Sequence, residues 1–459
     1  MQLLITVLLA LLLATFFHYS YACAQQDDEM LEASKDSVVR KEPTIKDPNL
    51  KVELVARGFE FPTSMAFLGP DDILVSEKNQ GTVTRVLGGR ISEEPLLDVN
   101  VATKAERGLL GIAAAINVTK KSPYIFLYYT ESERRDGDDL GGPGADEGNA
   151  PLGNRLYRYE LVDNKLIAPK LLLNLPSTDL AVHNGGVIEI GPDNNLYLLV
   201  GSGAEDNKDS PESSDTKVLN IQGGKDPDGR GGILRVNQDG EIVGNGLLGE
   251  VPPLNMYYAY GIRNGFGMDF DPVTGNLWDT ENGPRYGDEI NLVEPEFNSG
   301  WMQINGLASD DPEFDPADLE DFDGMGKYSD PEFAWVDSVG LTSLKFLDSK
   351  KLGEQYEYDM FVGDFHGGNI YDFDLNSDRK QLSLEGQLKD KKSDNEEELE
   401  GVIFGQNFGA ITDLEVGPDG YLYVLALYEG GDNCEGKEET ACIPYSSDVE
   451  GTIFRISPS

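Results

Sequence analysis

The feature that most constrains the fold of this chain is a unit of two strands joined by a tight turn, which recurs along the sequence. In each copy an apolar strand runs into a turn of Gly, Pro, Asp or Asn and is followed by a strand of aliphatic or aromatic residues. Four copies share nearly the same turn: MAFLGPDDILVSE from Met65, VIEIGPDNNLYLLVG from Val187, MDFDPVTGNLWDTE from Met268 and LEVGPDGYLYVLAL from Leu414. Two degenerate copies begin at Gly111 and Leu341. The repeat predicts an all-β chain of six units.

The spacing of the units predicts their architecture. Their turns fall near positions 69, 117, 191, 271, 347 and 417, a spacing that fits a four-stranded blade with its loops. We therefore expect a six-bladed β-propeller of four-stranded antiparallel blades. The N-terminal strand LKVELVARG, from Leu50, would complete the last blade and close the ring, which hides both sheet edges. An irregular pair of β-sandwiches is the alternative, and the repeated turn argues against it.

The first residues predict export. Residues 3–17 are almost wholly apolar and are followed by Ala22-Cys23-Ala24 and then by charged residues, which is typical of a secretory signal peptide over 1–24. No Lys or Arg precedes the apolar run, so a lipidated Cys23 or an uncleaved anchor is the alternative, and only then would the chain be held at a membrane. We expect a secreted or extracytoplasmic protein with a polar tether over 25–48 and the propeller over 49–459.

The remaining cysteines predict a disulfide rather than a metal site. After loss of Cys23 the chain keeps Cys434 and Cys442, whose spacing can close a small loop. Disulfides are common in exported chains, with free thiols as the alternative. Two mature cysteines and three histidines are too few for a soft-metal cluster.

The charge of the chain excludes one class of partner. A formal net charge of −45 opposes binding to nucleic acid, because phosphate backbones are bound by basic patches. Surface solubility explains most of this charge. The alternative is attraction of divalent cations, since residues 310–332 hold ten acidic side chains against one basic residue, Lys327, and a Ca²⁺ loop can lie there.

Polar residues in the loops between the expected strands are candidates for chemistry. His183 stands before a strand expected to be innermost in its blade, and the glycines at 185 and 186 let the backbone approach closely. Histidine titrates near neutral pH and suits proton abstraction from an alcohol, whereas the alternative is a structural side chain. Arg263 and Asn264 occupy the equivalent place in the next blade. An arginine there can hold a carboxylate or a developing oxyanion, or form a salt bridge between blades.

A Gly-Pro turn follows in the same stretch of the chain. The backbone carbonyls of Gly283 and Pro284 suit a hard cation such as Ca²⁺, and Asp288 can brace their loop. An isolated Gly-Pro pair carries no information, so its weight comes from the neighbouring residues.

Five motifs together resemble the glucose/sorbosone dehydrogenase family, the soluble quinoprotein aldose sugar dehydrogenases. They are ERGLLGIA from Glu106, HNGG from His183, YGIRNGFG from Tyr260, ENGPRYGDEINLV from Glu281 and NSGW from Asn298. The resemblance covers about residues 50–457 and follows the order of the family's motifs.

The resemblance implies an enzyme that oxidises an aldose or a related sugar hydroxyl with pyrroloquinoline quinone and Ca²⁺, and passes electrons to an external acceptor. His183 matches the base that takes the proton of the sugar hydroxyl. Arg263 and Asn264 match residues that contact the quinone, and Arg263 polarises its reacting carbonyl region. The Gly283-Pro284 turn matches the backbone ligands of the Ca²⁺, with Asp288 as a supporting acid.

Several positions depart from the family's pattern. At cofactor-binding positions, Glu106 replaces the usual Gln, His366 replaces a Lys, and Ala410 and Thr412 replace two arginines. Burying a quinone tricarboxylate without cations is costly. The departures support an alternative to the quinoprotein, a cofactor-free propeller that binds an extracellular glycan or protein. Lactone hydrolysis at a channel Ca²⁺ is a third hypothesis. The cations expected to compensate for the lost ones are Arg107, Lys225, Arg285 and His366.

Overall fold

The structure is a computed structural model, and it describes residues 42–116, 122–133, 151–203, 216–427 and 450–459. The predicted signal peptide, residues 25–41 of the predicted tether, and both Cys434 and Cys442 lie outside these ranges. Within the described ranges, no helix has both the length and the apolar character needed to cross a membrane.

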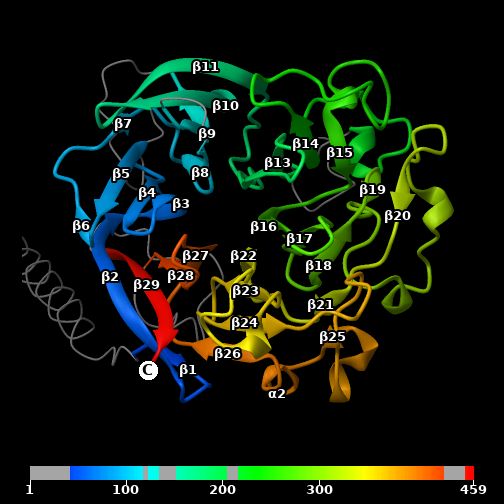
Figure 1. Cartoon of the computed structure of the whole chain (residues 1–459). Helices are drawn as coiled ribbons and strands as arrows, with labels where there is room; N and C mark the ends of the chain where they lie inside the picture. Colours follow the sequence, from blue (N-terminus) through cyan, green and yellow to red (C-terminus); the bar gives the residue numbers. More distant parts are fainter. Residues whose placement is uncertain (1–41, 117–121, 134–150, 204–215, 428–449) are drawn as a thin grey trace, which may run out of the picture. The chain divides into compact units, whose positions relative to one another are not determined.

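The strands form six sheets in the part of the chain that the structure describes, arranged around a centre (Figure 1). The first sheet has the order β3-β4-β5-β6, with β7 also pairing with β5. Its strands are β3 (Pro62–Gly69), β4 (Asp72–Glu77), β5 (Thr82–Leu87), β6 (Arg90–Ile91) and β7 (Leu97–Asp98). The second sheet has the order β11-β10-β9-β8, with β8 (Leu109–Ala115), β9 (Tyr124–Ser132), β10 (Pro151–Val162) and β11 (Lys165–Leu175).

The third and fourth sheets are interleaved along the chain. The third has the order β12-β13-β14-β15-β19-β20, with β12 (Ile188–Ile190), β13 (Leu196–Val200), β14 (Gly232–Val236), β15 (Tyr257–Tyr260), β19 (Phe297–Asn298) and β20 (Lys327–Tyr328). The fourth has the order β16-β17-β18-β21-β25, with β16 (Gly265–Phe270), β17 (Leu277–Glu281), β18 (Asp288–Val293), β21 (Phe333–Trp335) and β25 (Lys392–Ser393).

The last two sheets each include a strand from the start of the described chain. The fifth has the order β1-β26-β24-β23-β22, with β1 (Thr44–Ile45), β26 (Ile403–Gln406), β24 (Ile370–Phe373), β23 (Met360–Asp364) and β22 (Leu341–Phe346). The sixth has the order β2-β29-β28-β27, with β2 (Leu50–Glu60), β29 (Glu450–Pro458), β28 (Leu422–Ala426) and β27 (Ile411–Val416).

Helices in the described ranges are short. They are η1 (Lys217–Leu219), η2 (Leu254–Met256), η3 (Ala308–Asp310), η4 (Pro316–Asp318), η5 (Glu354–Tyr356), η6 (Gly386–Asp390) and α2 (Glu396–Leu399). The prediction of an all-β chain is therefore confirmed.

The strand at one end of each sheet faces the centre. These inner strands contact each other in the circular order β3, β8, β12, β16, β22, β27 and back to β3. Such a circle of sheets is a β-propeller, as predicted. The prediction of four strands in every sheet is wrong for the first, third, fourth and fifth sheets, because short strands from the connections or the N-terminal segment pair with their outer strands.

Sequence repeats account for the inner hairpins. In the third sheet the Asp193 carboxylate accepts hydrogen bonds from the Asn195 backbone N–H at 3.1 Å and the Tyr197 hydroxyl at 3.2 Å. In the sixth sheet Asp419 makes the same pair of contacts, with the Tyr421 N–H at 3.3 Å and the Tyr423 hydroxyl at 2.9 Å. An Asp that bonds to the backbone two residues on stabilises a turn, so these local motifs fix where each inner strand reverses.

Apolar side chains fill the space between adjacent sheets. One buried cluster joins Phe126 and Leu156 of the second sheet to Leu198 and Leu234 of the third. Burial of each such side chain stabilises the fold by about 1.5–3 kcal/mol. The inner strands are thereby held rigidly enough to position the loops at the centre.

The two ends of the described chain meet in the sixth sheet. Strand β2 pairs antiparallel with β29, from Leu50 opposite Pro458 to Glu60 opposite Glu450. Strand β1 pairs with β26, although its residues fall inside the range predicted as a tether. At Thr44 and Ile45 the chain is therefore part of a sheet rather than a flexible linker.

Candidate functional site

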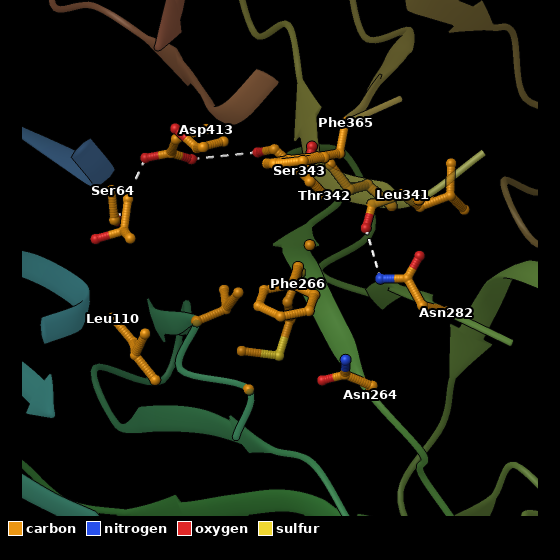
Figure 2. A pocket seen from close by; sticks show the side chains of 18 of the residues that line it. Ser64, Leu110, Asn264, Phe266, Asn282, Leu341, Thr342, Ser343, Phe365 and Asp413 are labelled. Carbon is orange, nitrogen blue, oxygen red and sulfur yellow. Dashed lines mark hydrogen bonds between the residues drawn. The ribbon is translucent and has the colours of Figure 1, made fainter. Parts of the chain in front are cut away.

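A cavity of about 600 Å³ lies at the centre of the circle of inner strands. All six sheets contribute to its wall, through residues such as Thr63, Leu110, Ile188, Met268, Ser343 and Leu414. Figure 2 shows its labelled residues converging from separate strands, with Asp413 hydrogen-bonded to both Ser64 and Ser343. Its volume lies in the range of about 300–1,000 Å³ that small-molecule sites occupy.

The structure brings the predicted site residues to this cavity in two layers. Glu106, Asn264, His366 and the Gly283-Pro284 turn line the cavity. His183, Arg263 and Asp288 are buried behind this lining, with exposed fractions of 7 %, 6 % and 0 %. The second layer contacts the first through the hydrogen bonds described next.

Glu106 connects the histidine loop to the Arg-Asn pair. Its Oε2 accepts the backbone N–H of His183 at 2.6 Å and the Asn264 side-chain amide at 3.4 Å. Burial raises the pKa of Glu106, while the bond from His183 and the charge of Arg263 oppose that rise. One carboxylate thus fixes two predicted site residues relative to each other.

The ring of His183 contacts Ser202. Its Nδ1 lies 3.2 Å from the Ser202 Oγ, so the hydroxyl helps to hold the orientation of the imidazole. The residue has a φ of 54°, in the left-handed region. Gly185, which follows, has a φ of 63°, and a Cβ there would lie 2.6 Å from the Leu199 carbonyl oxygen. A bulkier residue would push the histidine loop away from β13.

Arg263 links its own loop to the Gly283-Pro284 turn through hydrogen bonds. Its backbone N–H donates to Glu281 Oε1 at 2.6 Å, and its Nη1 donates to the backbone carbonyl of Asn282 at 2.7 Å. The guanidinium also lies 5.5 Å from the centre of the Trp301 ring. Burial raises the pKa of Glu281 to about 7, against the bonds from Arg263 and Ser299. The arginine therefore positions the residue that begins the turn.

Asp288 braces the Gly-Pro turn rather than offering its oxygens to a cation. Its Oδ1 accepts the Gly283 N–H at 2.9 Å and the Ser338 hydroxyl at 2.8 Å. Its Oδ2 accepts the backbone N–H groups of Val339 at 2.9 Å and Gly340 at 2.8 Å. With two hydrogen bonds to each carboxylate oxygen, Asp288 supports the turn from behind the cavity lining.

Two amide oxygens at the cavity are candidates for ligand binding. The Oδ1 atoms of Asn264 and Asn282 are buried and have no hydrogen-bond donor in the described ranges. The Asn282 Nδ2 donates a hydrogen bond to the Leu341 carbonyl oxygen at 2.8 Å (Figure 2). This bond identifies the nitrogen end of the amide, so the other end is the oxygen without a donor. Among the described residues, at the cavity or elsewhere, no group of three or more His, Cys, Asp or Glu side chains is placed to hold a metal, and this includes the acidic residues of 310–332.

The wall formed by the fifth and sixth sheets lacks the cations of the family pattern. Ala410 is fully buried and packs with Leu427, Phe61 and Phe365. Thr412 lines the cavity, and its hydroxyl donates to the Leu425 carbonyl at 3.4 Å.

The cations expected to compensate are mostly elsewhere. Arg107 is buried and donates to the Thr178 carbonyl. Lys225 and Arg285 are exposed and, like Arg107, are not part of the cavity wall among the described residues. His366 does line the cavity, at an exposed position.

A buried charge cluster at the cavity was not predicted. Lys345 Nζ lies 3.0 Å from Glu189 Oε1, 3.2 Å from Glu415 Oε2 and 3.5 Å from Asp269 Oδ1. Burial raises the pKa of Glu189 and of Glu415 to about 8, although Lys345 opposes both shifts. Each of these four residues stands two positions before the turn of its repeat, and this shared placement was the sequence signal for the cluster.

The sequence comparison decides the family. The model of the family described as "Glucose / Sorbosone dehydrogenase" matches residues 59–433, which is most of the chain. This chain belongs to the glucose/sorbosone dehydrogenase family.

A curated relative and several solved structures resemble this chain over most of its length. The aldose sugar dehydrogenase YliI of Escherichia coli is 26 % identical over 386 residues, covering 83 % of this chain and 91 % of that protein. The apo structure of the soluble aldose sugar dehydrogenase from E. coli covers 89 % of this chain and 100 % of its own, with a TM-score of 0.62 and 22 % identity. The PQQ-bound form of aldose sugar dehydrogenase from Streptomyces coelicolor covers 90 % and 100 %, with a TM-score of 0.60 and 21 % identity. The prediction of a dehydrogenase-like enzyme is confirmed.

Proposed function

We propose that this chain is a sugar-oxidising quinoprotein that uses pyrroloquinoline quinone and Ca²⁺. The observation that carries the proposal is one connected set: Glu106 joins His183 to Asn264, and Arg263 joins that pair to the Gly283-Pro284 turn at the cavity. The family match and the quinone in the name of the S. coelicolor relative support it.

The chemistry of the cavity fits both groups. Phe61, Phe266 and Phe365 line it and offer apolar faces to a planar ring system. The Gly283-Pro284 turn offers backbone carbonyls, which are hard oxygen ligands of the kind that Ca²⁺ prefers. The buried amide oxygens of Asn264 and Asn282 would gain partners from a ligand or its cation. When bound, the quinone supplies a two-electron acceptor and the cation polarises it.

Three residues of the chain have separate roles in the proposed reaction. The imidazole of His183, whose Nδ1 lies 3.2 Å from Ser202 Oγ, is the base in this proposal and takes the proton of the sugar hydroxyl. Glu106 holds the backbone of that histidine in place. Arg263 places a positive charge behind the Gly-Pro turn, where it favours charge that develops on a bound oxygen.

The proposal also covers the number of blades, the closure of the ring, export of the protein and its electron acceptor. We take each of the six sheets as one blade and β2 as the strand that closes the ring, which its pairing with β29 supports. Export is supported by the apolar segment at 3–17, and an external electron acceptor follows from export.

Reconstitution tests the proposed activity. Purified protein is loaded with Ca²⁺ and the quinone, and reduction of a dye acceptor is followed with a panel of aldoses. Dye reduction that depends on both additions is expected. Failure of the wild-type protein to bind the quinone at micromolar concentration would refute the proposal.

A second candidate function is a cofactor-free propeller that binds an extracellular glycan or protein. The observation in its favour is the wall at Ala410 and Thr412, where the family's arginines are replaced. The same quinone titration separates the two functions, since the binding module predicts no change in the quinone spectrum.

A further inference from the structure

The loop that begins with the Gly283-Pro284 turn carries an exposed aromatic side chain, Tyr286. Exposure rises from buried Gly283 through half-buried Pro284 to Tyr286, which is 57 % exposed, and falls again at Gly287. Gly283 and Pro284 line the cavity, so Tyr286 lies on the solvent side of that lining. Within the described ranges, no hydrogen bond or ring contact engages its side chain. The ring is therefore available to a ligand that extends out of the cavity.

The backbone that carries this ring is held in place. The Asn305 side-chain amide donates to the Tyr286 carbonyl at 2.7 Å. The N–H of the next residue, Gly287, donates to the Trp335 carbonyl at 2.7 Å. This pairing places Tyr286 beside the residue that follows Trp335, the apolar Val336, which is 38 % exposed. A fixed backbone presents the ring at little further cost in entropy when a ligand binds.

Two neighbours of Tyr286 show that it stands close to the cavity. The carbonyl of Arg285, the preceding residue, accepts the Ser338 N–H at 3.2 Å, and Ser338 lines the cavity. Pro284 also lines the cavity, and two residues of extended chain span at most about 7 Å. Tyr286 is therefore at the rim, within reach of a group attached to a molecule inside the cavity.

The chemistry of a sugar fits this rim. One face of a pyranose ring consists of C–H groups, which an aromatic ring can cover, while the hydroxyls at its edge stay in water. In the proposed function the sugar ring that is oxidised lies in the cavity with its hydroxyl at His183, so the rim contacts what extends from that ring. We propose that Tyr286 stacks on the second ring of a disaccharide whose reducing ring is oxidised, and that Val336 extends the apolar surface. This inference rests on the proposed function.

Steady-state dye reduction with glucose, maltose and cellobiose tests the inference, because glucose lacks the second ring. The proteins are the wild type, Tyr286→Ala, Tyr286→Phe and Val273→Ala, each loaded with Ca²⁺ and the quinone. Val273 is 55 % exposed in the turn before β17, at the other end of that strand from Gly283, and serves as the matched control. We expect Tyr286→Ala to lower the ratio of disaccharide to glucose kcat/KM about 3- to 10-fold through the disaccharide KM. Tyr286→Phe and Val273→Ala should keep the wild-type ratio.

The ratio separates stacking from damage to the turn, because a weakened cation site lowers activity on all three sugars alike. An unchanged ratio in Tyr286→Ala, or an equal fall in Tyr286→Phe, overturns the inference. A rise in the KM of the dye in place of the disaccharide KM also overturns it, and would assign Tyr286 to the electron acceptor. So does a wild type that oxidises glucose but neither disaccharide. A wild type that oxidises no aldose refutes the proposed function instead.

Discussion

Substitution of Lys345 by Met tests how the charge cluster at the cavity contributes to stability. The change removes one ammonium group. The Lys345 Nζ lies 3.0 Å from Glu189, 3.5 Å from Asp269 and 3.2 Å from Glu415, and all three carboxyl groups lose this partner. The Lys345 side chain is 12 % exposed, so water replaces little of the lost interaction. Removing one partner of a buried ion pair costs about 3–5 kcal/mol, and we expect about 3 kcal/mol near pH 9.

The loss depends on pH with a definite sign. Folding raises the pKa of Glu189 and Glu415 to about 8 from an ordinary value of 4.5. The folded state therefore binds more protons than the unfolded state between these values, and stability falls as the pH rises through about 8. At pH 5 both carboxyls are protonated in the folded protein, so loss of the lysine leaves less uncompensated charge and costs about 1 kcal/mol.

Thermal unfolding measures this difference. At about 1–2 °C per kcal/mol for a folded unit of this size, Lys345→Met should lower Tm by about 3–6 °C at pH 9 and by about 1–2 °C at pH 5. Lys350→Met is the matched control, because Lys350 pairs with Glu354 and Glu357 on the surface, and its Tm should stay close to that of the wild type. An equal shift at both pH values, or a larger one at pH 5, would show that the cluster does not act through charge.

Three further predictions concern the site and the fold. His183→Ala should lower dye reduction about 10²–10⁴-fold while the quinone titration stays unchanged, and a parallel loss of quinone binding would contradict its role as the base. Gly283→Ala places a Cβ 1.9 Å from the Tyr286 carbonyl oxygen, so the rise in Tm on adding Ca²⁺ should disappear, whereas Gly401→Ala, with open space around its Cβ, should keep it. Deletion of residues 42–60 removes β1 and β2, so β26 and β29 lose their partners, and the circular dichroism spectrum or the oligomeric state should change. A monomeric protein with a wild-type spectrum would show that these pairings are dispensable.

Local sequence signals predicted the fold well. The turns at Asp193 and Asp419 are stabilised by residues two and four positions away, so their motifs carry nearly all the information that the hairpins need. The additional outer strands, such as β19 and β20, have two residues each. Segments that short show no periodicity, and only the neighbouring sheet makes them strands.

The sequence named residues that lie in the cavity wall or behind it, but it did not indicate which of them line the cavity. His183 and Arg263 were expected in loops that face the channel, and the structure places them behind Glu106 and Asn282. The bond from His183 to Glu106 spans 77 positions of the sequence, and no pattern along the chain reports such a contact.

The pairing of β2 with β29 has a consequence for the order in which the protein can be completed. Strand β2 is the first strand of its sheet to be synthesised, and its partner β29 is the last strand of that sheet to be made. Until those residues emerge, one edge of β2 carries unpaired backbone groups that can pair with other chains. A product truncated before Glu450 lacks β29 and keeps that edge of β2 open.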